Sequence, residues 1–255
     1  MGQVVALRAP APEMREVPES SRRVLSFDVE RVLQDDVLRM AFQSIVELSG
    51  ETVLGFEALA RFPGEQDPSP RRWFLAADAL GMRHELELAA AASSLRQLDL
   101  LPDHAFVALN VSPITAGGAG MRQLLEEVDP TRVVLEVKED ASVVEYPRYS
   151  AAIEALRDHG VRIALDDTGT GNVGLQHLLD VRPDVLKIDT EVTRDIDRDP
   201  ARQAIACALG SLADRAGALS LAEGVETVEE LDMLRSLGIG AAQGFLFGRP
   251  ELLDA

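Results

Sequence analysis

Eight polar residues stand at or near the ends of short apolar runs, and their side chains could together hold metal ions. Five are carboxylates, two are amides and one is a lysine: Glu57, Asn110, Glu136, Asp166, Asp167, Lys187, Glu223 and Gln243. Carboxylate oxygens with an amide oxygen among them suit hard divalent ions such as Mg²⁺, Mn²⁺ or Ca²⁺ rather than zinc. Carboxylates crowded together at neutral pH repel one another unless cations lie among them. If these residues meet in space, they are suited to metal-assisted chemistry on phosphates.

The segment "LDDTGTGNVGL" at 165–175 also permits a different interpretation. Its glycines, Gly169, Gly171 and Gly174, match the G-x-G-x-x-G dinucleotide fingerprint, and Asp189 supplies the acid expected about 20 residues later. Such a fingerprint follows the first strand of its domain, whereas several strand-and-helix units precede this segment. The two carboxylates directly before the glycines would also repel a pyrophosphate. We therefore favour a metal site over direct binding of a dinucleotide.

The elements that must position these residues alternate between strand and helix patterns. Short β-branched or apolar runs predict eight strands, at 40–48, 52–62, 105–112, 132–139, 161–167, 184–189, 218–224 and 241–247. Amphipathic patterns between them predict helices, among them 83–98, 149–160, 199–216 and 227–238. Strands that alternate with helices indicate parallel β-structure. Eight strands favour an α/β fold of the TIM-like (β/α)₈ type over a six-stranded open sheet.

A barrel would bring the polar residues together, because the carboxyl ends of its strands share one rim where barrel enzymes place their active sites. Most of the intervals between these residues lie near the roughly 30-residue length of a βα unit. An acid at one strand end often only caps the following helix, but recurrence on seven successive strands indicates a shared site. The first two strands are separated only by "SGET", so they can form a hairpin in which the first strand runs antiparallel.

The bulk composition restricts the class of protein. The chain has 255 residues, with 43 acidic against 25 basic side chains and a formal net charge of -18. A chain this acidic is a poor general binder of nucleic acid or of anionic membranes, so we expect neither as a partner. We predict a flexible N-terminal tail at 1–25, where prolines and mixed charges show no clear period, and one barrel domain at 26–255.

Single residues bear on core packing, and the lack of membrane-spanning or signal-peptide patterns bears on the cellular compartment. The sequence has one cysteine, Cys207, which cannot form an internal disulfide and which we expect to be buried in the helix at 199–216. The single Trp73 is expected in the core rather than as a platform for base stacking. With no apolar run of membrane-spanning length and no signal-peptide pattern, we expect a cytoplasmic protein.

Seven short motifs occur in order along the chain: "FEALARF" (56–62), "LNVSP" (109–113), "LEVKED" (135–140), "LDDTGTG" (165–171), "LKID" (186–189), "AEGVET" (222–227) and "QGFLFGRP" (243–250). Together they resemble the EAL-domain phosphodiesterases, which open cyclic di-GMP to linear pGpG. The resemblance covers roughly residues 27–253. It implies a TIM-like barrel that binds cyclic di-GMP and two divalent cations, Mg²⁺ or Mn²⁺, with Ca²⁺ as an inhibitor.

The resemblance assigns the metal ligands by motif. One ion would be held by Glu57, Asn110, Glu136 and Asp166. Asp166 would bridge to the second ion, for which Asp167 would be a further ligand.

The resemblance also assigns residues to the reaction and the substrate. Lys187 would orient and help activate the attacking water, Glu223 would support the cluster of metal and water, and Glu57 would be catalytic through its metal. Gln243 would position water or substrate near the cluster. Arg61, just after the E-A-L tripeptide, would bind a substrate phosphate.

The loop after the aspartate pair departs from the family pattern. The family usually has D-F-G-T-G-Y-S-S-L, whereas this chain has "DTGTGNVGL". Thr168 and Asn172 replace two aromatic residues, and Val173 with Gly174 replaces a serine pair. In the family this loop links the metal site to the dimer interface and is anchored by a glutamate, which Glu139 matches. The loss of both aromatic side chains predicts a weakened link between site and dimer.

These observations predict a cytoplasmic, metal-dependent cyclic di-GMP phosphodiesterase. The altered loop keeps an alternative open, in which a weakly active or inactive EAL domain serves as a cyclic di-GMP receptor or a protein-interaction module. A barrel enzyme acting on another phosphodiester or on a carbonyl substrate is a third interpretation. We expect a homodimer, with regulation through the tail, through oligomerisation or through a separate regulatory protein.

Overall fold

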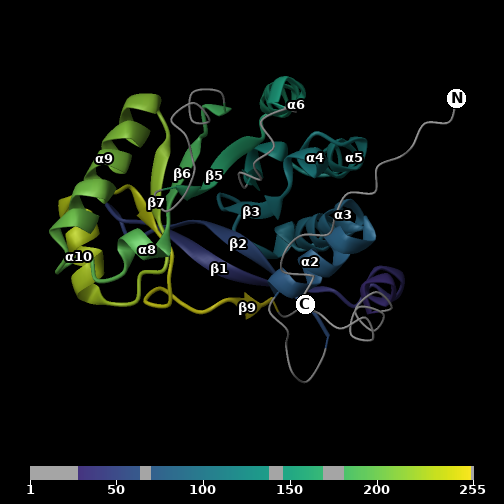
Figure 1. The fold of residues 1–255 in the computed structure, drawn as a ribbon, viewed down its shortest axis with the longest axis horizontal. Coiled ribbons are helices and arrows are strands. Elements are labelled where there is room, and N and C mark those ends of the chain that lie inside the picture. The colour runs from purple at the N-terminus through teal and green to yellow at the C-terminus, as the bar shows by residue number, and fades with distance from the viewer. Residues whose placement is uncertain (1–27, 64–69, 138–145, 169–180, 254–255) are drawn as a thin grey trace, which may run out of the picture.

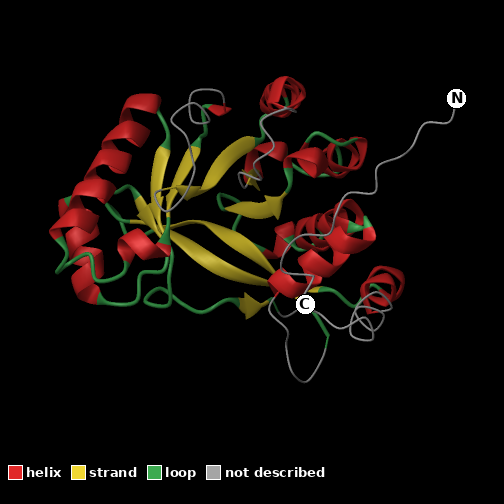
Figure 2. Cartoon of the chain, in the orientation of Figure 1, coloured by secondary structure: helices red, strands yellow, loops and turns green. Residues whose placement is uncertain are grey.

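A computed structural model describes residues 28–63, 70–137, 146–168 and 181–253. Figure 1 shows a barrel of strands with helices on its outside, and Figure 2 distinguishes the helices in red from the strands in yellow. The predicted tail at 1–25 lies outside the described residues. After a helix at 28–35, the first strands are β1 (Arg39–Glu47) and β2 (Val53–Arg61).

The remaining strands alternate with helices, as the sequence pattern predicts. The strands are β3 (Phe106–Val111), β4 (Val133–Val137), β5 (Arg162–Thr168), β6 (Val185–Ile188), β7 (Leu219–Ala222), β8 (Ala241–Ala242) and a short β9 (Glu251–Leu252). The longer helices are α2 (Pro70–Leu80), α3 (Arg83–Leu95), α5 (Ala119–Leu125), α6 (Tyr146–Asp158), α9 (Pro200–Ala216) and α10 (Val228–Ser236). Shorter turns of helix are η2 (Leu98–Leu100), α4 (Pro113–Ala116), η3 (Pro130–Arg132) and α8 (Thr190–Thr193).

Strand pairing closes the barrel. Strands β2 to β8 pair in sequence order and are parallel, and β1 pairs with both β8 and β2 in the antiparallel sense. The predicted TIM-like barrel and its antiparallel first strand are both confirmed. The barrel interior is packed by one small apolar cluster: Ile45, Phe106, Ala108, Val134, Ala164, Val185, Leu221 and Ala241.

Two expectations about single residues had different outcomes. Trp73 is buried in α2 and its ring stacks on Phe62 at a centroid distance of 4.6 Å, so its place in the core is confirmed. Cys207 is exposed on α9, and the expectation that it is buried was wrong. The apolar stripe of α9 meets the barrel through Ala206, Gly210 and Ala213, and the residue next to Ala206 points to solvent.

Helix α10 begins as its sequence predicts. The hydroxyl of Thr227 accepts a hydrogen bond from the Glu230 backbone N–H, and the Glu230 carboxylate accepts one from the Thr227 N–H. This capping box satisfies N–H groups that the first turn of a helix leaves unpaired. The same carboxylate also accepts from the N–H groups of Glu226 and Asp195, which fixes the segment that follows β7.

Gly244 is required by close approach of two backbone segments beside β8. A Cβ atom at this position would lie 2.1 Å from the carbonyl oxygen of Val225 and 2.3 Å from its nitrogen.

We expect Gly244→Ala to lower the free energy of unfolding by about 3 kcal/mol, because backbone atoms cannot move aside as a side chain can. Urea unfolding measures this change. Gly238→Ala is the control, since Gly238 has φ 77° but no atom near its Cβ position, and it should cost only about 1–2 kcal/mol. Equal costs for the two variants would contradict the steric explanation.

Candidate active site

The polar residues of the sequence pattern form the layer above the apolar interior. Side chains on a strand alternate between the two faces, so a residue two positions after an interior residue also points inward. Asn110 follows Ala108 by two positions in the sequence. Five other polar residues likewise each follow one residue of the apolar cluster by two positions. These five are Glu136, Asp166, Lys187, Glu223 and Gln243. The barrel therefore gathers at one rim the residues that lie far apart in sequence.

Strands β1 and β2 complete this polar layer with residues well inside their spans. Glu57 lies in the middle of β2 rather than near its end, because β2 continues past the rim to Arg61. Gln43 lies directly opposite Glu57 in the antiparallel pairing of β1 with β2. Gln43 was not predicted from the sequence as a site residue. The available signal was a single amide within the otherwise apolar run "MAFQSIV".

Lys187 is the centre of the cluster. Its Nζ atom lies 2.7 Å from Glu136 Oε2 and 2.7 Å from Glu223 Oε1. Asp166 Oδ1 lies 3.6 Å away and Glu57 Oε1 3.9 Å away. The Lys187 side chain is only 1 % exposed, so its charge is balanced by these carboxylates rather than by water.

The electrostatics of the cluster follow from this geometry. Burial alone would lower the pKa of Lys187, but the carboxylates of Glu136, Glu223, Glu57 and Asp166 outweigh it and raise the pKa well above its ordinary value. Burial, reinforced by repulsion from Glu57, raises the pKa of Glu136 well above its ordinary value despite the attraction of Lys187. Burial also raises the pKa of Glu223 to about 7, with Asp166 adding to the shift and Lys187 opposing it. One ammonium therefore does not fully compensate the negative charge gathered here.

Amide side chains fix the orientation of the Glu57 carboxylate. Asn110 Nδ2 donates to Glu57 Oε1 at 2.7 Å, and Gln243 Nε2 donates to Glu57 Oε2 at 2.7 Å. Gln243 Nε2 also donates to Gln43 Oε1 at 2.9 Å, and Gln43 donates in turn to the carbonyl of Gly248. Four strands thus contribute to the position of one carboxylate, which is the kind of outer support that sites for metal ions require.

The Asn110 end of β3 is held by a buried glutamate on α3. Glu87 Oε2 accepts hydrogen bonds from the Ser112 backbone N–H at 2.9 Å and from the Ser112 hydroxyl at 2.6 Å. Its other oxygen accepts from Arg83 Nε at 2.7 Å. Glu87 was not predicted from the sequence, because a glutamate in an alanine-rich helix gives no sign that it is buried.

The donor chemistry of the cluster fits divalent cations. Glu57, Glu136, Asp166 and Asn110 offer hard oxygen atoms, and a cation would relieve the repulsion that Glu57 and Asp166 exert on the buried Glu136 carboxylate. Among the described residues, no three Asp, Glu, His or Cys side chains surround a single point closely enough to form a complete metal site. Lys187 lies 2.7 to 3.9 Å from four carboxylates of the cluster, so a cation held there would share these carboxylates with its ammonium.

Several predicted site residues cannot be placed in this cluster. Asp167 belongs to the backbone of β5, but its side chain lies outside the described part of the structure. Glu139 and the altered loop residues Asn172, Val173 and Gly174 also lie outside the described residues. Arg61 is described, and its Nη1 donates to the carbonyl oxygens of Leu59 and Ala60 on its own strand.

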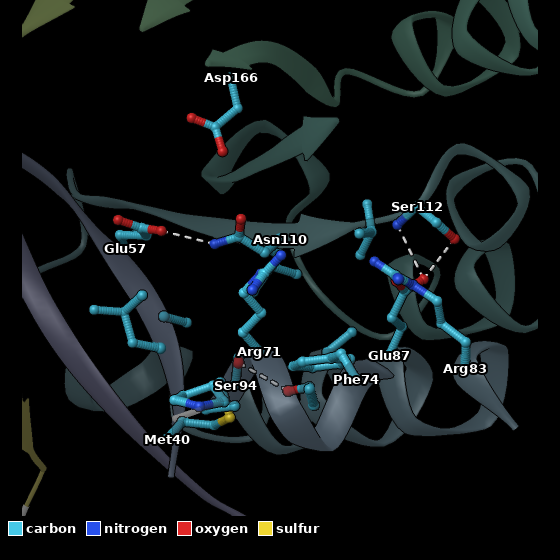
Figure 3. A pocket seen from close by; sticks show the side chains of 18 of the residues that line it. Met40, Glu57, Arg71, Phe74, Arg83, Glu87, Ser94, Asn110, Ser112 and Asp166 are labelled. Atoms are coloured by element: carbon cyan, nitrogen blue, oxygen red, sulfur yellow. Dashed lines mark hydrogen bonds and ion pairs between the residues drawn. The ribbon is translucent and has the colours of Figure 1, made fainter. Parts of the chain in front are cut away.

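A pocket of about 650 Å³ opens beside the cluster, between the barrel rim and helices α2 and α3. Its polar wall includes Glu57, Asn110, Asp166, Lys187 and Glu223. Its other wall carries apolar side chains together with two arginines: Met40, Leu75, Phe74, Arg71 and Arg83. Figure 3 shows Asp166, Glu57 and Asn110 near one another, with Arg71 reaching from α2 toward Asn110. The pocket thus joins a metal-ligand surface to an apolar surface on which a planar ring could lie.

Known proteins are similar to this chain in sequence and in fold. Residues 28–250 match the EAL domain. The cyclic di-GMP phosphodiesterase NbdA of Pseudomonas aeruginosa is 33% identical over 240 residues, which cover 89% of this chain and 31% of NbdA. The chain spans about a third of the length of the first curated relatives it matches.

Two solved structures illustrate the likeness in three dimensions. The PaMucR phosphodiesterase in complex with cyclic di-GMP has a TM-score of 0.81 and 28% identity, covering 90% of this chain and 98% of that one. BlrP1 of Klebsiella pneumoniae with manganese and cyclic di-GMP has a TM-score of 0.76 and 34% identity, covering 84% of this chain and 56% of that one. BlrP1 has also been solved with calcium and cyclic di-GMP. Because the family match runs from the helix before β1 to the segment between β8 and β9, this chain belongs to the EAL domain family.

Proposed function

We propose that this EAL domain hydrolyses cyclic di-GMP to linear pGpG with two divalent cations, Mg²⁺ or Mn²⁺. The observation that carries the proposal is the convergence of Glu57, Glu136 and Asp166 around Lys187 beside one pocket. Asn110 joins the cluster through its hydrogen bond to Glu57. Relatives that bind cyclic di-GMP with manganese or calcium support the choice of ligand and of a divalent cation. When bound, two such ions lower the pKa of water, neutralise phosphate oxygens and clamp an in-line displacement.

The chain's own residues would prepare the site for this reaction. Glu57, Asn110, Glu136 and Asp166 would hold one ion, and Asp166 with Asp167 the second. The raised pKa of Lys187 keeps its ammonium protonated at neutral pH, so it would donate hydrogen bonds and orient the attacking water rather than remove its proton. Glu223 would hold Lys187 in place, and Gln243 would fix Glu57 and position water or substrate.

The rest of the assignment follows the resemblance. Arg61 would bind a substrate phosphate after its side chain leaves the carbonyls of its own strand, and Glu139 would anchor the loop after the aspartate pair. Ca²⁺ would bind but inhibit.

We place the protein in the cytoplasm as a homodimer, regulated through the tail at 1–25 or by a separate protein. None of the helices in the described part of the chain has the length and apolar character needed to cross a bilayer.

Incubation of the purified protein with cyclic di-GMP and Mn²⁺ or Mg²⁺ tests the proposal, with pGpG followed by chromatography. Formation of pGpG that stops on chelation and resumes when metal is added back would support it. Binding of cyclic di-GMP without turnover would favour the alternative, a receptor or protein-interaction module. Absence of both binding and turnover would reject both functions, and a panel of other phosphodiesters would then be the next substrates.

A further inference from the structure

Glu87 is a buried carboxylate on α3 that the proposed reaction does not use. It is 2% exposed, although it forms part of the pocket wall. Burial of a carboxylate is unfavourable unless hydrogen-bond donors or cations replace the water around it. The groups that replace this water therefore indicate which part of the molecule depends on the charge.

One oxygen of Glu87 holds the residue that follows β3. Oε2 accepts from the Ser112 backbone N–H at 2.9 Å and from the Ser112 hydroxyl at 2.6 Å, and both bonds are drawn in Figure 3. Hydrogen bonds to a charged acceptor are stronger than bonds between neutral groups. Ser112 is also the N-cap of α4, where its side chain accepts from the Thr115 N–H. The junction between β3 and α4 is therefore fixed through both the backbone and the side chain of one serine.

The other oxygen of Glu87 is fixed by an arginine. Arg83 Nε lies 2.7 Å from Glu87 Oε1, and Arg83 Nη1 lies 2.7 Å from the Asp78 carboxylate on α2. The arginine thus ties α3 to α2 and keeps the Glu87 carboxylate turned toward Ser112. Since both of its oxygens already accept hydrogen bonds within the protein, Glu87 is better placed to orient its neighbours than to bind a ligand.

The strand end that Glu87 holds carries Asn110. Ser112 follows Asn110 by two positions, so a shift of the backbone at Ser112 would change the direction of the Asn110 amide. On the side of β2, the pairing of β3 ends with Leu109, one residue before Asn110. On the side of β4 it continues to Val111. Beyond Leu109, the contact with Glu87 supplies the support that β2 no longer gives.

We propose that Glu87 is a positioning residue for the metal site, a role that rests on the proposed function. Through Ser112 it holds Asn110 so that the amide nitrogen donates to Glu57 at 2.7 Å and the amide oxygen is left for a cation. Removal of partners that orient metal ligands typically changes metal affinity or activity about 10–100-fold. Glu87 acts on the metal through these neighbours and contacts neither the ion nor the substrate.

Three variants and one control test this role. Glu87→Ala removes the carboxylate, Glu87→Gln keeps one acceptor for Ser112, and Ser112→Ala keeps only the bond from the backbone N–H. Glu85→Ala is the matched control, because Glu85 is an exposed carboxylate in the first turn of the same helix. Calorimetry measures binding of Mn²⁺ to the substrate-free protein, and thermal unfolding measures the stability of the metal-free protein. Both kcat and KM for cyclic di-GMP are measured at several Mn²⁺ concentrations.

We expect Glu87→Ala to raise the Kd for Mn²⁺ about 10-fold or more, with Glu87→Gln and Ser112→Ala each losing only part of that affinity. At low Mn²⁺ the kcat of Glu87→Ala should fall and excess Mn²⁺ should restore it, whereas its KM for cyclic di-GMP should stay within about 2-fold of the parent. Glu85→Ala should keep its Mn²⁺ affinity within about 2-fold of the parent, as is usual for a surface substitution.

Unchanged Mn²⁺ affinity in Glu87→Ala, with the parent protein binding normally, would overturn the role of Glu87 and leave the proposed function intact, even if the variant unfolds at a lower temperature. A rise in KM that excess Mn²⁺ does not reverse, with Mn²⁺ affinity unchanged, would overturn it in favour of a direct contact between Glu87 and the substrate. A parent protein that binds no Mn²⁺ would overturn both the role of Glu87 and the proposed metal-dependent reaction.

Discussion

Glu57→Ala is expected to reduce kcat/KM for cyclic di-GMP by at least about 100-fold, and added Mn²⁺ should not restore it. Loss of a residue that merely supports a metal ligand costs about 10–100-fold in activity or affinity, so loss of a ligand should cost more. Both carboxylate oxygens of Glu57 accept amide hydrogen bonds, from Asn110 and from Gln243. The variant therefore removes a ligand and also leaves two amide groups without their acceptor.

The measurement is pGpG formation across a range of Mn²⁺ concentrations, with circular dichroism to confirm that the barrel is folded. Glu154→Ala is the control, because Glu154 is a carboxylate of the same type that is 64% exposed on α6. It should leave turnover unchanged. Turnover by Glu57→Ala near the parental level would contradict the proposed metal site.

Lys187→Met is expected to lower the free energy of unfolding of the metal-free protein by about 3–5 kcal/mol at pH 8. This is the usual cost of removing one partner from a buried set of charges, since the remaining charges are left without compensation. Glu136 is 1% exposed and would lose the ammonium that lies 2.7 Å away. The cost should fall at lower pH, because the pKa of Glu136 is already raised and a proton can neutralise it. The variant should also lose turnover, as the proposed orientation of the water depends on Lys187.

Thermal unfolding with and without Mn²⁺ measures this effect. A drop of roughly 10 °C is expected for a domain of this size, and Mn²⁺ should recover much of it by supplying the missing positive charge. Arg235→Met is the control, because Arg235 is more exposed than Lys187 and pairs with Glu51 at the surface. Its cost should be below about 1 kcal/mol. A metal-free Lys187→Met protein as stable as the parent would show that the ammonium does not hold the cluster together.

Much of the site could be predicted because barrel strands impose a regular pattern. Six of the polar residues follow interior apolar residues by two positions, and alternation on a strand directs both inward. This is a local property, so it can be read from the order of residues without knowledge of the neighbours. The capping box at Thr227 and Glu230 is local for the same reason, since both residues lie within one turn.

Other features depend on contacts between distant segments. Gln43 lies opposite Glu57 only because the first hairpin has one particular register, and a shift of one residue would turn its amide away from the site. Cys207 was predicted as buried because its helix is amphipathic, but α9 turns Ala206, Gly210 and Ala213 toward the barrel and leaves Cys207 on its exposed side.

The sequence by itself determined the alternation of strands and helices, the inward-facing acids and amides, and the motifs shared with the EAL domain family. These depend on residue order and on the two-residue period of a strand. Only the tertiary structure decided that Lys187 lies among four carboxylates and that Arg71 rather than Arg61 lines the pocket. The physical reason is that closure of the barrel sets the distances between strands, and packing of α2 and α3 selects the side chains that face the cavity.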